Sequence, residues 1–97
     1  MTDSQARLHA FVSGMVQGVG FRYFVLDVAN DARSVGWVRN LRDGRVEVLA
    51  EGARPSLEAL LQRIRQGPRG ARVERVDFSW EPATGEFSRF GLERTGP

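Results

Sequence analysis

The stretch Gly14-Met-Val-Gln-Gly-Val-Gly-Phe-Arg22 decides the fold, because it joins two segments with different periodicities. Before it, residues 7–13 alternate between apolar and other side chains, which is typical of a strand. After it, the apolar residues of 21–32 recur with helical spacing. The sequence therefore predicts a strand, a glycine-containing turn and a helix.

The turn also suggests a chemistry. Gly18 and Gly20 permit backbone angles that other residues largely avoid, so a tight loop can turn several N–H groups toward one point. The start of the next helix adds unpaired N–H groups and a partial positive charge, and Arg22 adds a permanently charged, two-pronged donor. This arrangement suits an anion, above all a phosphate. A lone Gly-x-Gly is a weak signal, however, and a turn without a ligand fits it equally well.

Size and composition limit the possibilities. The chain has 97 residues, of which 41% are hydrophobic, enough for one compact domain. No stretch is long and apolar enough to cross a bilayer, and the first residues lack the layout of a signal peptide. We expect a single domain over residues 1–97 with frayed ends at 1–6 and 95–97, located in the cytoplasm and without a membrane partner.

Several residue types are missing. There is no cysteine and only one histidine, which excludes disulfides, thiolate sites, cysteine nucleophiles and a histidine-based metal cluster. We expect that single residue, His9, to be a surface or structural hydrogen-bonding residue. All 14 basic residues are arginines, scattered among 12 acids with a net charge of +2 and no basic tract. The composition therefore predicts no nucleic-acid partner.

The rest of the chain completes a familiar order of elements. A helix is indicated by the spacing of Leu57, Leu60, Leu61 and Ile64, and Asp43-Gly44 is a strong hairpin signal. A break in alternation near Glu74 and Arg75 predicts a bulge. The predicted elements are strands at 36–42 and 46–51, a loop at 52–54, a helix at 55–66, and strands at 72–80 and 87–93.

The order is β-α-β-β-α-β with a short terminal strand. Because each helix has a single apolar stripe, both can cover one face of an antiparallel sheet. The fold class predicted from the pattern is α+β, a two-layer ferredoxin-like sandwich.

Two segments resemble the signatures of one family. Gln17-Gly-Val-Gly-Phe-Arg22 closely resembles the phosphate-binding loop of the acylphosphatase family, and Gly36-Trp-Val-Arg-Asn-Leu-Arg-Asp-Gly-Arg-Val46 resembles its second signature. The resemblance implies the same ferredoxin-like fold. It also implies an acylphosphatase, a hydrolase that acts on acid anhydrides and splits small acyl phosphates into carboxylate and inorganic phosphate. Neither metal nor cofactor is implied, and inorganic phosphate is expected to inhibit competitively.

By resemblance, Arg22 binds the phosphate and Asn40 positions the attacking water. The loop is expected to act mainly through backbone N–H groups, those of Val16, Gln17, Gly18, Val19, Gly20 and Phe21. Such a site contains no obvious acid, base or nucleophile. An acyl phosphate needs no general acid, because its leaving carboxylate has a pKa of about 4 and departs without a proton. Positioning and charge stabilisation can then carry most of the catalysis.

The chain departs from its relatives in two places. Met15 stands where relatives usually carry arginine or lysine, so we expect weaker long-range attraction of dianions with the loop intact. Residues 32–35 replace the usual Leu-Gly-Leu run after the first helix. Without that glycine, Arg33 or Ser34 must adopt the capping geometry, or the helix must end differently.

Two alternatives remain open. A non-catalytic or regulatory anion-binding domain could use the same loop, since acylphosphatase-like domains also occur inside larger proteins that handle carbamoyl groups. An RNA-binding module shares the order of elements, but strand 46–51 has no stacking aromatic and carries two acids. We expect a monomer whose partner is a small acyl phosphate.

Overall fold

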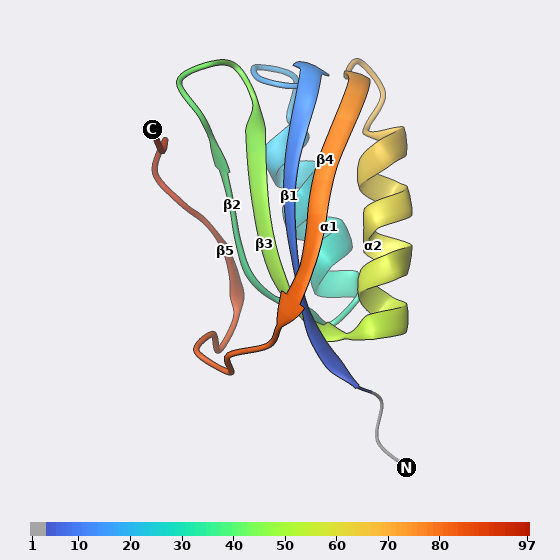
Figure 1. Ribbon diagram of the computed structural model, residues 1–97. Coiled ribbons are helices and arrows are strands. Elements are labelled where there is room, and N and C mark those ends of the chain that lie inside the picture. Colours follow the sequence, from blue (N-terminus) through green and yellow to red (C-terminus); the bar gives the residue numbers. More distant parts are fainter. Residues whose placement is uncertain (1–3) are drawn as a thin grey trace.

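One twisted sheet carries both helices on a single face, as Figure 1 shows for the computed structural model, which describes residues 4–97. The five strands lie in the order β4-β1-β3-β2-β5. Along the chain the elements are β1 (Gln5–Met15), α1 (Phe21–Asp31), β2 (Val35–Asn40), β3 (Val46–Ala53), α2 (Arg54–Gln66), β4 (Arg72–Pro82) and β5 (Phe90–Leu92).

The pairing of the strands confirms the ferredoxin-like α+β prediction. β1 pairs antiparallel with both β3 and β4, and β2 pairs antiparallel with β3. β5 lies parallel to β2, so the sheet is mixed at this edge. This parallel pair arises because residues 83–89 form a crossover connection. They carry the chain from β4 at one edge of the sheet to the side of β2 at the other edge (Figure 1).

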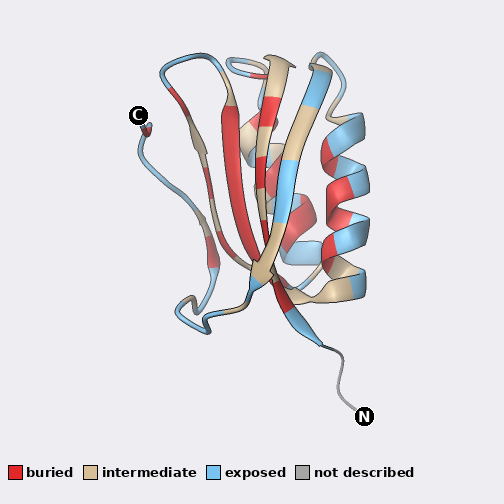
Figure 2. Cartoon of the chain, in the orientation of Figure 1, coloured by how far each residue is buried: buried red, intermediate tan, exposed pale blue. Residues whose placement is uncertain are grey.

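The core lies between the sheet and the helices, as the predicted periodicities require. Leu8, Ala10 and Val12 of β1 are fully buried, and so are the matching positions of β3. Figure 2 shows the buried stripe of each helix turned toward the sheet. Burial of one such aliphatic side chain contributes about 1.5–3 kcal/mol, and this burial supplies the main driving force for folding. The helical residues of the core are Phe21, Val25, Val28, Ala29, Leu57, Leu60, Leu61 and Ile64.

Two predicted boundaries are wrong. β3 continues to Ala53 and α2 begins at Arg54, so the loop expected at 52–54 does not exist. The backbone N–H of Arg54 donates to the carbonyl of Ser4 at 3.0 Å, which ties the start of the helix to the start of β1.

Near both chain ends the described residues pair with the sheet or with the turn that follows β2. Residues 1–3 lie outside the described part of the chain, but β1 already begins at Gln5 and Ala6 is buried. At the other end, the N–H of Gly96 donates to the carbonyl of Asn40 at 2.9 Å, and Pro97 accepts from Arg42 at 3.2 Å. Residues near both ends of the described range are thus hydrogen-bonded to segments that are distant in sequence.

Two local predictions are confirmed. Arg33 takes φ 55°, so an arginine adopts the left-handed geometry that ends α1. The N–H groups of Arg33 and Ser34 donate to the carbonyls of Asn30 and Ala29, both at 3.0 Å. In β4, the register shifts between the pairs Ser13↔Arg75 and Gly14↔Val73, which is the expected bulge at Glu74.

Candidate active site

The loop between β1 and α1 is anchored at its ends and exposed in its middle. Val16 and Phe21 are each 1% exposed and hold the loop to the core. Between them, Gly18 and Gly20 both have φ 76°, a conformation that favours glycine. A Cβ atom at either position would meet nothing within 4 Å, so backbone conformation and not space requires these glycines.

The backbone of this loop offers several hydrogen-bond donors. Gly20 is the N-cap of α1, which has no side-chain cap and no acid in its first turn. Within the described residues, none of the N–H groups from Gln17 to Tyr23 donates a hydrogen bond, whereas Phe24 donates to the carbonyl of Gly20 at 3.0 Å. The positive end of the helix dipole is therefore not neutralised by the protein, and the loop is suited to an anion.

The side chain of Gln17 fastens the loop to the turn between β2 and β3. Its Nε2 donates to the carbonyl of Leu41 at 2.7 Å and to that of Arg45 at 2.9 Å. Leu41 directly follows Asn40, so the two segments selected from the sequence are joined by hydrogen bonds. Sequence reasoning expected this side chain to shape the loop but could not name the partner.

Asn40 is the last residue of β2. It shares a face with Val38, which is fully buried in the core, so its side chain lies on the face that the helices cover. The alternation of residues along β2 did not by itself show which face of this strand packs against the helices. Its Oδ1 atom is buried, and no hydrogen-bond donor within residues 4–97 reaches it. A buried acceptor without a partner costs about 1–3 kcal/mol, so a role outside the protein's own hydrogen bonding is expected.

Arg22 is the second residue of α1 and is half-buried. It forms no ion pair with any acid in the described part of the chain. A positive charge at the start of a helix is unfavourable by about 0.3–1 kcal/mol, which a bound anion would reverse. α1 begins at the end of the sheet where β2 stops, so Arg22, Asn40 and the loop come to the same end (Figure 1).

His9 has the structural role expected for it. Its Nε2 lies 2.6 Å from Oε2 of Glu47, whose Oε1 accepts from Nε of Arg39 at 2.7 Å. These residues lie on the sheet face away from the helices. No group of three or more histidine, aspartate or glutamate side chains within the described residues is placed to hold a metal ion.

A second buried acid on this face, Glu51, was not singled out from the sequence. Burial opposes its ionisation, but hydrogen bonds from the N–H groups of Thr84 and Gly85 and from Arg7 outweigh that cost and lower the pKa of Glu51 from 4.5 to about 2. The carboxylate thereby fixes the connection between β4 and β5 against β3. The alternation of Glu47, Leu49 and Glu51 opposite the core positions was the available signal.

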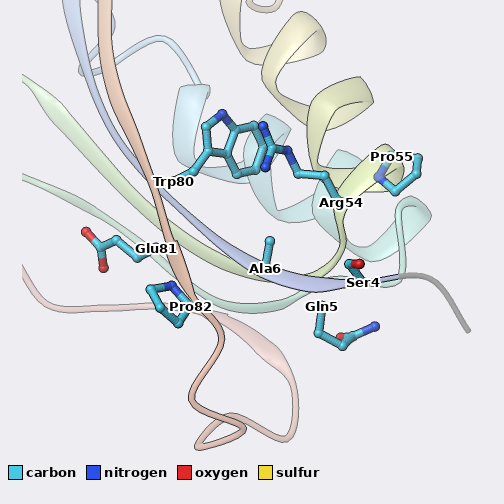
Figure 3. A pocket seen from close by; sticks show the side chains of 8 residues that line it. All are labelled: Ser4, Gln5, Ala6, Arg54, Pro55, Trp80, Glu81 and Pro82. Atoms are coloured by element: carbon cyan, nitrogen blue, oxygen red, sulfur yellow. The ribbon is translucent and has the colours of Figure 1, made fainter.

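A cavity of about 610 Å³ lies at the opposite end of the sheet. Figure 3 shows Arg54 lying against the ring of Trp80, with its guanidinium carbon 3.8 Å from the ring centre, and Glu81 turned away from the cavity. No residue of the glycine loop lines it, so the cavity and the loop are separate. The lining residues are Ser4, Gln5, Ala6, Arg54, Pro55, Trp80, Glu81 and Pro82.

Fold and site together define a class of protein, a small ferredoxin-like domain whose glycine loop exposes unpaired backbone N–H groups. The acylphosphatase family model matches residues 8–92. An acylphosphatase from Chloroflexus aurantiacus is 51% identical over 86 residues, which cover 89% of this chain and 94% of that protein. The chain therefore belongs to the acylphosphatase family, which confirms the predicted family and its hydrolase function.

Solved structures agree with this assignment. The crystal structure of acylphosphatase from Bacillus subtilis superposes with a TM-score of 0.88 at 35% identity, covering 91% of this chain and 98% of that one. HypF from T. kodakarensis gives a TM-score of 0.81 at 32% identity, covering 94% of this chain but 12% of that one. The same fold thus also occurs as a small part of a much longer chain. No helix among the described residues has the length and apolarity needed to cross a membrane.

Proposed function

We propose that this chain hydrolyses small acyl phosphates to a carboxylate and inorganic phosphate without a metal ion. In this proposal the N–H groups of residues 16–21 and the guanidinium of Arg22 hold the phosphate, and Asn40 positions the attacking water. The observation that carries it is the buried Oδ1 of Asn40, which lacks a donor within the described residues and belongs to a segment bonded to the uncapped glycine loop. We further propose a monomeric, cytoplasmic enzyme with no membrane or nucleic-acid partner.

The reaction needs little from the protein beyond position and charge. Oδ1 of Asn40 accepts a hydrogen bond from the water and orients it toward phosphorus, opposite the bond between phosphorus and the acyl oxygen. As water attacks, that bond breaks and its electron pair leaves on the carboxylate, while the protons of the water stay on the phosphate product. The charge on the equatorial phosphate oxygens is met by the loop N–H groups and Arg22.

The same residues explain a preference for acyl phosphates over phosphate esters. An alkoxide needs a proton to leave, and the proposed site residues include no acid that could supply one. A carboxylate, with a pKa of about 4, leaves unprotonated at neutral pH.

The alternative of an RNA-binding module gains no support from the sheet. Its face opposite the helices carries ion pairs on the central strands, Arg39 with Glu47 and Arg7 with Glu51, and His9 also contacts Glu47. Phe11 on this face lies under the guanidinium of Arg45, with the guanidinium carbon 4.8 Å from the ring centre.

Hydrolysis of benzoyl phosphate by the purified protein, with a chelator present, tests the proposal. We expect turnover that inorganic phosphate inhibits competitively. Arg22→Ala should weaken both phosphate binding and turnover, whereas Arg89→Ala, at the opposite end of the molecule, should change neither. A folded protein that binds phosphate but leaves benzoyl phosphate intact would favour the non-catalytic alternative.

A further inference from the structure

The glycine loop lies between two turns that both carry arginines. On one side, Met15 pairs with Arg72, and Gly67 lies next to Phe21, whose ring would be 3.4 Å from a Cβ atom at that position. On the other side, Gln17 bonds to the turn between β2 and β3. Figure 1 shows the loop and both turns at the same end of the sheet, at the top of the view.

Three arginines of these turns form no ion pair within the described residues. Arg42, Arg69 and Arg72, here called the basic rim, are exposed, and none pairs with an acid within residues 4–97. The acids of these segments are Asp43, whose Oδ2 lies 2.8 Å from Nε of Arg45, and Glu74.

The basic rim provides more positive charge than one phosphate group needs. The phosphate dianion is already met by the loop N–H groups and Arg22 under the proposed function, on which this inference rests. We propose that the basic rim selects acyl phosphates whose acyl group carries a negative charge of its own. Exposed charges act over a Debye length of about 8 Å at physiological ionic strength, and over this range the rim would attract the acyl end of a small substrate held by the adjoining loop.

The rim also changes the expectation for Met15. Sequence reasoning predicted a weaker attraction of dianions because a basic residue is missing at that position. The strand register places Arg72 directly beside Met15, so a neighbouring strand carries a positive charge at the same place. The charge of Arg72 on β4 would therefore maintain the long-range attraction of dianions.

Two substrates and two variants with equal charge changes test the selectivity. Succinyl phosphate has an anionic acyl group and benzoyl phosphate a neutral one, and kcat/KM is measured for both. The selectivity is the kcat/KM for succinyl phosphate divided by that for benzoyl phosphate. In the double variant Arg69→Gln/Arg72→Gln, this ratio should fall about tenfold at low ionic strength and approach the wild-type ratio at high salt. The control Arg33→Gln/Arg89→Gln has the same charge change at the other end of the molecule and should keep the wild-type ratio. Arg72→Lys keeps the charge and should also keep it.

A second readout separates failure of this inference from failure of the proposed function. The dissociation constants of phosphonoacetate and methylphosphonate, measured by calorimetry, compare an anionic with a neutral substituent without any turnover. The rim variant should lose affinity for phosphonoacetate selectively. Equal effects of both double variants on these ratios, or no effect of either, would overturn the inference even if hydrolysis is confirmed. Thermal unfolding of each variant checks that it is folded.

Discussion

At the scale of single residues, replacing Asn40 should affect activity without affecting stability. Because the buried Oδ1 has no donor within the described residues, its removal loses no internal hydrogen bond. We expect Asn40→Ala to lower kcat by roughly 10²–10³-fold, as for one lost transition-state group, with an unchanged or higher free energy of unfolding. Steady-state kinetics and urea unfolding measure the two effects.

Ser34 is the matched control for this prediction. It is also buried, but its hydroxyl donates to the carbonyl of Ala29 at 2.9 Å. Ser34→Ala should therefore cost about 1 kcal/mol of stability and leave kcat intact. A substantial loss of stability in Asn40→Ala would show that its side chain is structural.

Gly20 provides a second prediction at this scale. Its φ of 76° is unfavourable for residues with a Cβ atom by about 1–2 kcal/mol, although open space surrounds the position. We expect Gly20→Ala to destabilise the protein by about this amount and to weaken inhibition by inorganic phosphate, whereas Gly20→Asn should be less destabilising because asparagine tolerates the conformation. Urea unfolding and inhibition constants provide the test, and equal stabilities of both variants would contradict it.

At the scale of elements, the end of α1 contains backbone strain that a single substitution can remove. Arg33 occupies the left-handed region with φ 55°, where glycine is usual. We expect Arg33→Gly to raise the free energy of unfolding by about 0.5–1 kcal/mol, since relief of strain exceeds the extra entropy of glycine in the unfolded chain. Arg33→Ala removes the same charge but keeps the strain, so it should bring no gain. Activity should not change in either variant.

At the scale of the whole molecule, the sequence predicted the features that depend on neighbouring residues better than those that depend on residues far apart in the chain. The loop, the start of α1 and the hairpin follow from glycine positions and periodicity within a few residues of one another. The covered face of β2 did not follow, because parity groups Asn40 with Val38 but does not say which face the helices cover. The backbone hydrogen bonds and strand pairing of Gln5, Ala6 and Gly96 involve partners far along the chain. The same is true of the contacts of Glu51 with Arg7 and Thr84. The roles of Arg22 and Asn40 stay predictions.

At this scale Glu51 also makes part of the stability of the fold dependent on pH. Its pKa is lower in the folded protein than its ordinary value of 4.5, so its contribution is fully present above pH 4.5 and is lost as the pH falls toward about 2. This difference corresponds to a contribution on the order of 3 kcal/mol. We expect Glu51→Gln to lower the free energy of unfolding at pH 7 and to make it less dependent on pH between 4.5 and 2. Urea unfolding at several pH values measures this, and parallel pH profiles of both proteins would contradict it.

The composition of the basic rim has a consequence for the durability of the protein in contact with activated acids. Acyl phosphates transfer their acyl group to free amines, and a lysine side chain with a pKa near 10.4 always exposes a small reactive fraction. The guanidinium of arginine stays protonated and is not a nucleophile at neutral pH. With 14 arginines and no lysine, the chain would keep the positive charges of the proposed basic rim without exposing them to acylation by its own substrates.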